Sequence, residues 1–558
     1  MDVRSLTIAP GTAALAVLVN VLVAGPACGA PADGGAPAEV LADTPTPQEA
    51  DGFDWFWAIS GPVSGDAGSD LSVDAEGNVF LAGSHGGLDM DKDGVVDFAS
   101  GGVSYEGAQN SLVMKLSRGP SDDRVRLRWM RSPRNPADRS QTRVAADNHG
   151  GVYVIGAFAE YLAFEDGQTL PGAGGNDGFI ARYDGEGSVI WAKVFGGPGS
   201  DAVYDVASDR AGNAYVVAMG VGAFPLDDGT EFRASGERGS VLLSYGPEGD
   251  LRWARMFPAG IPLAFRLGVA PNGDIYATGE LEGAADIDGD GTVDLPAPAD
   301  RDGFVARFDS AGNLLGAWAT PVPAHPAIAR NGDVFMGSAM GGPMGKRYGP
   351  ADFTGDGKAD IELKGGGPTS AWVARYTPEG ELRWVRSYTL EMPADIAVQG
   401  GYIVLSGNYK GVRDLDEDGE AERVDRTVDP SLETDLAILI LSVEDGRPVR
   451  VWTAPGPGND WANAVAFLPN EPALVVTGAI QLTADFTGDG EAGEGWALCE
   501  HLGDIFFAQY RLGEFRAKER VEEYREEERR EEVREEERGE EERRDEERRE
   551  EERERSGE

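Results

Sequence analysis

Cysteine and histidine are scarce in this chain of 558 residues. There are two cysteines, Cys28 and Cys499, and four scattered histidines, so the sequence holds neither a disulfide framework nor the Cys/His spacing of a zinc site. It also carries no nucleophile elbow and no phosphate-binding glycine loop. These absences predict that the protein is not an enzyme. We expect His85 to be a solvated loop residue and Cys499 to have no catalytic role.

Positive charge is scarce as well. The chain has 50 Lys and Arg residues against 97 Asp and Glu residues, which gives a formal net charge of −47. Like-charge repulsion argues against nucleic acids and anionic membrane surfaces as partners, and it favours divalent cations. Glycine, in contrast, is abundant, with 78 residues, as expected when many tight turns join short strands.

A tryptophan-centred repeat is the most informative feature that is present. Each tryptophan is followed by a turn such as DAEGN (74–78), a short apolar strand, a loop rich in Gly and Asp, and a second apolar strand. A four-strand unit that recurs at the spacing of these tryptophans predicts an all-β fold, a seven-bladed β-propeller of four-stranded antiparallel blades. The anchors are Trp57, Trp129, Trp191, Trp253, Trp318, Trp384 and Trp452.

The two ends of the repeat region are incomplete in complementary ways. Residues 54–60 form a tryptophan strand with no blade of its own, and the last unit stops at the strand 504–511. We therefore expect 54–60 to complete the seventh blade and close the ring, which removes exposed sheet edges. The predicted organisation is a signal peptide (1–27), a flexible linker (28–53), the propeller (54–512) and a Glu/Arg-rich tail (513–558). For the tail, a helix and a disordered segment remain equally open.

The N-terminal segment predicts export. Residues 5–27 are apolar, rich in small residues and end at Cys28, as in a secretory signal, and a Pro/Ala/Gly linker follows. Small residues before a single cysteine resemble a bacterial lipoprotein signal. That resemblance implies cleavage and lipidation at Cys28 and, because Gly29 follows, placement in the outer membrane. Ordinary secretion is the alternative, and both readings put the mature protein outside the cytoplasm.

Five loops between the second and third strands of a unit repeat an acidic pattern. Oxygen-bearing side chains stand at positions 1, 3, 5 and 9 of a nine-residue stretch, with glycine at position 6; the last loop has Gly493 at position 9. Oxygen ligands at alternate positions can wrap Ca²⁺ while the glycine permits a sharp turn. The candidate ligands are Asp89, Asp91, Asp93 and Asp97; Asp286, Asp288, Asp290 and Asp294; Asp352, Thr354, Asp356 and Asp360; Asp414, Asp416, Asp418 and Glu422; and Asp485, Thr487 and Asp489.

Asp and Gly also favour ordinary turns, which is the alternative reading of these loops. Four carboxylates within nine residues repel one another unless a cation is present, so recurrence at one place in the repeat favours calcium. The corresponding segments of the second and third units carry only EDG (165–167) and DDG (227–229), where we expect plain turns. All five acidic loops should emerge on one face of the ring, which becomes the candidate ligand-binding face.

The repeat resembles the bacterial SBBP repeat, a seven-bladed β-propeller repeat of extracellular proteins. The residues that carry the resemblance are GGNDGFIARYDGEGSVIW (174–191) and WAKVFGGPGSDAVYDVASDRAGNAYV (191–216), and it covers about 54–512. The resemblance implies the fold and an extracellular setting, and it is silent about activity, because one scaffold hosts many functions.

The sequence therefore predicts a secreted, lipid-anchored, calcium-stabilised monomeric propeller that acts as a cell-surface binding or structural module. Its ligand would be a glycan or a protein, and its only membrane contact the lipid anchor. The alternative is an extracellular polysaccharide-active propeller enzyme, a lyase or a glycosidase. A third possibility is a matrix component crosslinked through calcium. An enzyme should bring acids, Tyr, His or Arg together at one mouth of the axial channel, whereas a binding module need not.

Overall fold

The computed structural model describes most of the repeat region. Contacts divide the chain into two units, Met1–Leu41 and Ala42–Glu558, and every described residue belongs to the second. The structure describes residues 53–59, 66–85, 87–88, 98–99, 110–118, 125–135, 142–234, 236–259, 261, 263–297, 302–341, 350–354, 360–362, 369–410, 415, 434–454, 458–469, 471–481, 483–485, 496–498 and 504–512.

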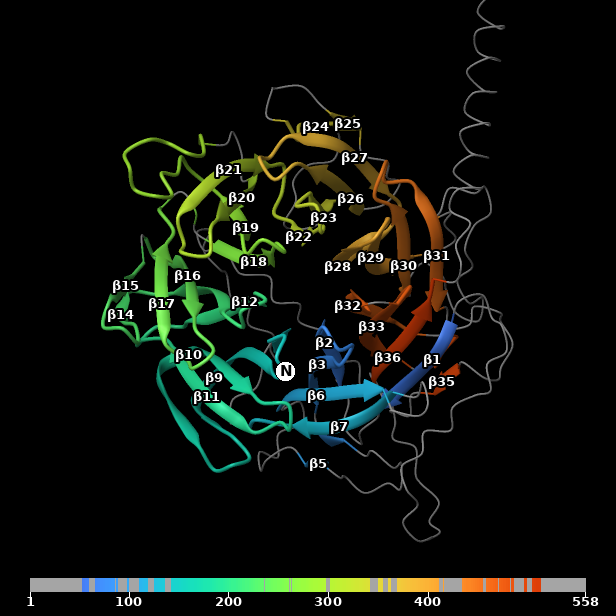
Figure 1. Ribbon diagram of the computed structural model, residues 1–558, viewed down its shortest axis with the longest axis horizontal. Coiled ribbons are helices and arrows are strands. Elements are labelled where there is room, and N and C mark those ends of the chain that lie inside the picture. Colours follow the sequence, from blue (N-terminus) through green and yellow to red (C-terminus); the bar gives the residue numbers. More distant parts are fainter. Residues whose placement is uncertain are drawn as a thin grey trace, which may run out of the picture. The chain divides into compact units, whose positions relative to one another are not determined.

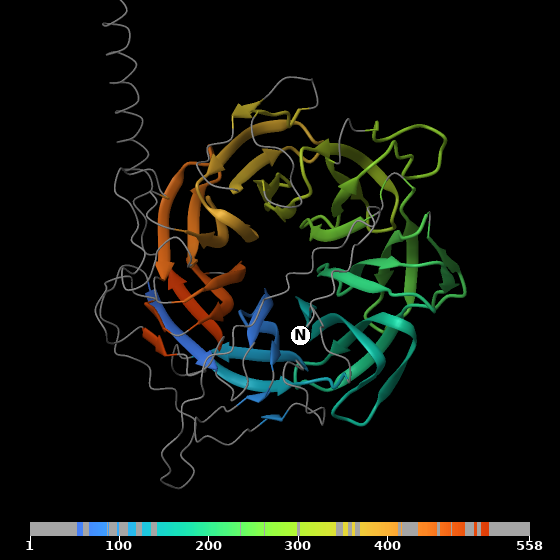
Figure 2. The same ribbon diagram turned by 180° about the vertical axis from the view of Figure 1, so that it is seen from behind.

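Seven four-stranded antiparallel sheets form the blades, which we number in chain order. Figures 1 and 2 show them in a ring, with the first strand of each blade nearest the axis. The strands of blades 1 to 4 are β2 (Ala67–Val73), β3 (Val79–His85), β6 (Asn110–Arg118) and β7 (Val125–Arg131); β8 (Arg143–Ala146), β9 (Val152–Ala163), β10 (Thr169–Tyr183) and β11 (Val189–Phe195); β12 (Ala202–Ser208), β13 (Ala214–Gly220), β16 (Gly239–Tyr245) and β17 (Leu251–Met256); and β18 (Leu263–Val269), β19 (Ile275–Leu281), β20 (Asp302–Phe308) and β21 (Leu314–Thr320).

The remaining three blades repeat this order. Their strands are β22 (His325–Ile328), β23 (Val334–Gly341), β26 (Thr369–Tyr376) and β27 (Leu382–Tyr388); β28 (Glu391–Gln399), β29 (Tyr402–Tyr409), β30 (Asp435–Ser442) and β31 (Pro448–Ala454); and β32 (Trp461–Phe467), β33 (Ala473–Ile480), β36 (Asp504–Arg511) and β1 (Phe53–Ile59). Within the described residues all regular structure is strand, and no helix there is long and apolar enough to cross a membrane.

The N-terminal strand closes the ring, as the sequence predicts. β1 lies at the outer edge of blade 7 and pairs antiparallel with β36, with Trp57 opposite Phe507. Blade 7 thus takes its first three strands from the end of the repeat region and its fourth from the beginning. β1 therefore covers the edge that β36 would otherwise expose, and the two ends of the repeat region are joined in one sheet.

The core lies between neighbouring blades. The second and third strands are buried on both sides; β13 and β16, for example, have every residue buried. Apolar clusters join adjacent sheets, so that Tyr153 and Ile155 of blade 2 share a cluster with Val216 and Val241 of blade 3. This explains why these strands appear in the sequence as continuous apolar runs rather than alternating ones.

In four blades the repeated tryptophan donates an indole hydrogen bond to the next blade. Trp191 Nε1 donates to the carbonyl of Pro247, 2.8 Å away in blade 3, and Arg182 Nη1 donates to the same oxygen at 2.9 Å. A Cβ on Gly249 would lie 2.9 Å from Trp191, and this residue has a φ of +85°, so the turn requires glycine. Similar indole contacts link Trp129 to Gly185, Trp253 to Ser310 and Trp384 to Val443.

Four short two-stranded sheets extend from the blades. Three of them flank acidic loops, and β14–β15 carries the short DDG turn of blade 3. The pairs are β4 (Gly87–Leu88) with β5 (Phe98–Ala99), β14 (Ala223–Pro225) with β15 (Glu231–Arg233), β24 (Pro350–Ala351) with β25 (Ile361–Glu362), and β34 (Thr483–Asp485) with β35 (Trp496–Leu498).

Candidate functional site

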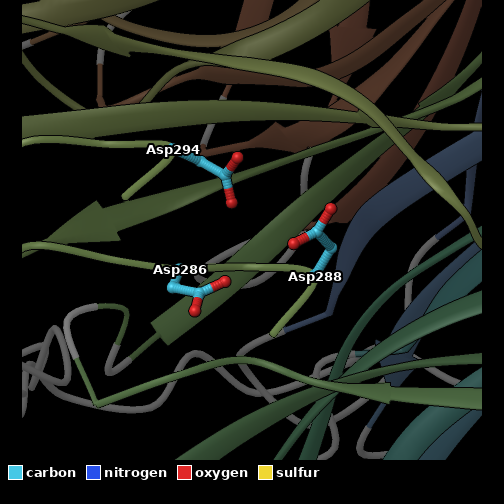
Figure 3. Close-up of side chains that lie close together, drawn as sticks. All are labelled: Asp286, Asp288 and Asp294. Atoms are coloured by element: carbon cyan, nitrogen blue, oxygen red, sulfur yellow. The ribbon is translucent and has the colours of Figure 1, made fainter. Parts of the chain in front are cut away.

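The acidic loop of blade 4 brings three of its predicted ligands together. Asp286, Asp288 and Asp294 each offer a carboxylate oxygen, and these oxygens lie within 4.8 Å of one another. Figure 3 shows the three side chains turned toward a common space. Asp290, the fourth predicted ligand, is not a member of this group; its carboxylate accepts the amide of Thr292 at 2.6 Å.

Backbone amides hold this loop in shape. Asp286 accepts the amides of Gly289 and Gly291 at 2.8 and 2.9 Å, and Asp294 accepts the amide of Ile287 at 2.7 Å. Gly291 has a φ of +90°, which explains the glycine at position 6. Ile287 is buried in the apolar cluster that joins blades 3 and 4. The loop is therefore anchored in the core, while its carboxylates stay near the surface.

The loop of blade 5 shares two internal hydrogen bonds with the loop of blade 4. Asp360 accepts the amide of Phe353 at 2.6 Å, as Asp294 accepts that of Ile287, and its own amide donates to Ala351 at 2.9 Å. The equivalent bond in blade 4 joins Asp294 to Ala285, also at 2.9 Å. Thr354 Oγ1 lies 3.3 Å from Asp352 and 3.4 Å from Asp360, so the described oxygens converge here too.

Backbone pairing places the acidic loops at equivalent positions. The residues that close the loop pair across it in three blades: Leu88 with Phe98, Ala285 with Leu295, and Ala351 with Ile361. In blade 7 the closing pair is Asp485 with Trp496. By contrast, blades 2 and 3 have plain turns closed by Gly167 to Phe164 and Gly229 to Leu226, as expected.

The other predicted ligands lie outside the described residues, and for Asp485 the structure describes the backbone alone. The lipidation candidate Cys28, Cys499 and the Glu/Arg-rich tail also lie outside the described residues. The predictions outside the described residues are Asp89, Asp91, Asp93, Asp97, Asp356, Asp414, Asp416, Asp418, Glu422, Thr487 and Asp489.

A ring of charged residues on the inner strands is the second candidate site, and our sequence analysis missed it. We compare the inner-strand residues that pair with one equivalent position of the second strand in every blade. In six blades this inner-strand residue is ionisable. In blade 7 the position is Ala464. We call this set the axial ring; in blade order its members are Asp70, Arg143, Asp205, Arg266, His325, Asp395 and Ala464.

The three aspartates of the axial ring are oriented by the next blade. Asp70 accepts the amide of Val144 at 2.9 Å, Asp205 that of Leu267 at 2.8 Å, and Asp395 that of Val465 at 3.0 Å. Burial raises the pKa of Asp70 to about 7, although Arg143 opposes the shift. Burial likewise raises the pKa of Asp205.

Arg266 and His325 of the axial ring contact each other, and His325 also lies near Asp395. Arg266 Nε donates to His325 Nε2 at 3.1 Å, and His325 Nδ1 lies 4.0 Å from Asp395. Burial lowers the pKa of His325 to about 4, so the imidazole is neutral at pH 7, and its proton belongs on Nδ1 because Nε2 accepts. Burial also lowers the pKa of Arg266 to about 10, and the nearby Arg143 adds to this effect.

His85 corrects one expectation from the sequence. It is not a solvated loop residue: it ends β3, is fully buried, and its Nε2 lies 2.7 Å from Ser132 Oγ. Burial lowers its pKa to about 4. Since the imidazole is inaccessible, we assign it to packing between blade 1 and the segment that follows β7.

No protein-family model and no curated protein matches this chain. Among solved structures, the chain is similar to Sqt1 of Chaetomium thermophilum, with 9% identity over 82% of this chain and 98% of that one and a TM-score of 0.40. It is also similar to the β-propeller domain of Cps50 (Swd1) from Myceliophteria thermophila, with 9% identity, 81% and 98% coverage, and a TM-score of 0.36. A neuraminidase-like protein of A/little yellow-shouldered bat/Guatemala has 10% identity, 82% and 99% coverage, and a TM-score of 0.31. These values transfer no function. The strand pairing itself defines the chain as an all-β, seven-bladed propeller.

Proposed function

We propose that the protein is a calcium-stabilised propeller that acts outside the cytoplasm as a surface binding module. The observation that carries this proposal is the convergence of Asp286, Asp288 and Asp294, whose oxygens lie within 4.8 Å of one another. Three carboxylates held this close repel one another strongly unless a cation lies between them. Ca²⁺ is the cation that flexible loops with many oxygen ligands suit best.

The recurrence of the loop supports calcium over a simple acidic turn. Blades 4 and 5 fold their loops with the same amide-to-carboxylate and amide-to-carbonyl bonds, although only some of the loop residues are the same. Ile287 and Phe353, which follow the first ligand in each loop, are buried. A cation bound at the tip would therefore stabilise the packing of the blade beneath it, because it binds only the folded loop.

An extracytoplasmic location fits this chemistry. Sites of this kind in extracellular modules need only a Kd of about 10⁻⁴–10⁻³ M, since calcium outside cells is on the order of millimolar. The lipoprotein-like segment that ends at Cys28 and the resemblance to extracellular SBBP propellers point the same way. Mass spectrometry of the mature N-terminus tests this part: we expect a lipid on Cys28, and an unmodified start at another residue would contradict the anchor.

The binding role is tested by presenting ligands to the calcium-loaded protein. The face that carries the acidic loops is the proposed contact surface, and the partner is a glycan or a protein bound by a monomeric propeller. A glycan array, run once with calcium and once with a chelator, should give signals that calcium strengthens. If the array is silent, a pull-down from the cell surface with the same two conditions decides whether the ligand is a protein.

A polysaccharide-active enzyme is the second candidate, and the axial ring is the observation that favours it. Asp, Arg and His side chains from six blades converge around the axis, which is the arrangement expected of a propeller enzyme. Two carboxylates in different environments are the usual requirement of glycoside hydrolysis. Release of reducing ends from a panel of polysaccharides, abolished by Asp205→Asn, would support this candidate over a binding module.

A further inference from the structure

A groove lies on the turn face of the seam between blades 1 and 2. This face carries the turns that join first to second strands and third to fourth strands, whereas the acidic loops join second to third strands and lie on the opposite face. The groove has a volume of about 720 Å³, within the roughly 300–1,000 Å³ of small-molecule sites. The side chains that line it are Asn78, Lys115, Ser117, Arg128, Trp129 and Glu186.

At this seam a lysine replaces an arginine of the repeat. Lys115 lies opposite the repeated tryptophan of its blade, as Arg182 does in blade 2 and Arg375 in blade 5. Each of these arginines donates to an aspartate in the first turn of its own blade and to a carbonyl of the next blade, an arrangement that we call the arginine lock. The ammonium of Lys115 instead donates to two carbonyls of blade 2, those of Gly150 at 2.8 Å and Gly185 at 3.3 Å.

Lys115 is a buried cation with no carboxylate partner among the described residues. It is 8% exposed, and the aspartate equivalent to that of the lock, Asp74, is occupied by its own turn. Asp74 accepts the amides of Glu76 and Asn78 at 3.1 and 2.8 Å and the side-chain amide of Asn78 at 2.6 Å. Two carbonyls and the ring of Phe80, 5.2 Å from Nζ, stabilise the ammonium only in part. A buried charge is costly without a counter-charge, so an anion in the groove would be favoured.

The rest of the lining suits an acidic sugar. Arg128 is exposed, adds a second cation and donates through Nε to Ser117 Oγ. Glu186 contributes the one carboxylate of the lining, so two cations and one anion face the groove and leave room for a single negative charge. Glu186 and the side-chain carbonyl of Asn78 are acceptors for hydroxyl groups, and Trp129 supplies an apolar wall.

We propose that this groove binds an acidic sugar residue, a hexuronate, whose carboxylate accepts from Lys115. The carboxylate supplies the counter-charge of the buried ammonium, and ring hydroxyls donate to Asn78 and Glu186. A neutral sugar leaves the ammonium without a partner, and a phosphate ester brings a second negative charge beside Glu186. This site goes beyond the proposed calcium-dependent surface, since it lies on the opposite face of the ring and contains no acidic loop.

Isothermal titration calorimetry of the full chain tests the proposal. The probes are D-galacturonate and D-glucuronate, with D-galactose and D-glucose as matched neutral sugars and acetate as a carboxylate without a ring. We expect one uronate to bind at least about tenfold more tightly than its neutral counterpart and than acetate, because a charge-assisted contact adds to the sugar contacts. No uronate binding, equal affinity for uronate and neutral sugar, or acetate binding as tightly as both uronates would overturn the proposal.

A lysine variant assigns the carboxylate end of the ligand. Lys115→Met removes the ammonium but keeps most of the stem, and it should weaken the uronate about tenfold while neutral sugars bind unchanged. Lys193→Met is the matched control, since Lys193 pairs with Asp227 of blade 3 at 3.5 Å, away from the groove. If Lys115→Met does not fold, Arg128→Gln is read instead and should weaken the uronate several-fold. Unchanged uronate binding in the variant that is read would contradict the assignment.

Transplanting the arginine lock of blade 2 should close the groove. The residue of blade 2 equivalent to Asn78 is Gly151, where a Cβ would lie 2.7 Å from Asp147 of the lock. The double variant Asn78→Gly/Lys115→Arg should therefore let the guanidinium reach Asp74 and fill the groove. Uronate binding should be lost without a lower melting temperature, and a stable double variant that still binds the uronate would place the ligand elsewhere and overturn the proposal.

This outcome is separable from that of the calcium proposal. The titrations are run with saturating calcium and repeated with chelator, and the melting temperature is recorded in both. Uronate binding should not change, because the groove and the acidic loops lie on opposite faces. Binding that disappears with chelator would overturn the groove as the site, whereas intact uronate binding with a melting temperature indifferent to calcium would contradict the calcium proposal alone.

Discussion

Replacing Arg375 with Met should weaken the seam between blades 5 and 6. Arg375 Nε donates to Asp333 at 2.9 Å, Nη2 donates to the same carboxylate oxygen, and Nη1 donates to the carbonyl of Val443 in blade 6 at 3.0 Å. The side chains of Arg375 and Asp333 are 21% and 13% exposed. The guanidinium carbon also lies 5.7 Å from the centre of the Phe335 ring, a cation–π contact that is lost with the charge. Met keeps most of the apolar stem, so the change isolates the guanidinium.

The magnitude follows from the lost hydrogen bonds. A hydrogen bond to a charged group contributes about 1.5–3 kcal/mol. Without Arg375 the largely buried Asp333 carboxylate keeps the side-chain amide of Asn331, 2.9 Å away, but loses its charged partner. Val443 keeps one donor, because Trp384 Nε1 lies 3.3 Å from its carbonyl. Partial exposure to solvent screens the ion pair, so we expect a loss of about 3 kcal/mol in the free energy of unfolding rather than the sum of all terms.

Guanidinium-induced unfolding, followed by tryptophan fluorescence, measures this loss. Arg383→Met is the matched control, since Arg383 lies in the next strand of the same blade and pairs with Glu381 at 3.9 Å, with side chains 57% and 72% exposed. An exposed pair contributes at most about 1 kcal/mol, so the control should be almost neutral. If both variants unfold at the same denaturant concentration, the lock does not stabilise the seam and our account of the repeat is wrong.

Two further predictions concern ring closure and pH. Removing residues 1–60 deletes β1 and exposes the edge of β36, so the truncated chain should melt at lower temperature and associate on size-exclusion chromatography; an unchanged monomer with an unchanged melting point would show that closure is dispensable. The pKa of His85 is about 4 in the folded protein against 6.5 for an ordinary histidine, so the unfolded chain binds the proton first as the pH falls. The contribution of His85 to stability should therefore be complete above pH 6.5 and fall by about 3 kcal/mol toward pH 4. Because His325 and Asp70 also titrate in this range, the measurement is the difference in stability between the wild type and His85→Gln in a pH series of denaturation curves, which should change by about that amount.

The blades could be predicted from the sequence because each repeat encodes its own local chemistry. A turn glycine with positive φ, a tryptophan strand and two apolar runs recur at a fixed period, and ring closure followed from which strands were missing at the two ends. The acidic loops were predictable for the same reason, since all the candidate ligands of a loop lie within nine residues. Asp290 remains a predicted ligand: all four carboxylates of the loop accept backbone amides, but Asp290 is not in the group whose oxygens lie within 4.8 Å of one another.

The axial ring could not be seen by reading along the chain. Its members are one residue per repeat, separated by about one period, and they approach one another only because the ring closes. An alignment of the inner strands with one another would have shown ionisable residues at one equivalent position in successive repeats, as in Asp70, Arg143 and Asp205. His85 was missed for a different reason, since whether a polar residue at a strand end is covered depends on the segment after β7.

Calcium titration calorimetry on the chelator-treated protein tests the central claim most directly. We expect binding with a Kd of about 10⁻⁴–10⁻³ M and a rise in melting temperature that chelator reverses. Asp288→Ala should lower the number of sites by one without unfolding the ring. Asp228→Ala, in the plain turn of blade 3 where the carboxylate only caps Thr230, should leave the number unchanged. Absence of calcium heat, together with a melting temperature indifferent to chelator, would contradict the account and reduce these loops to acidic turns.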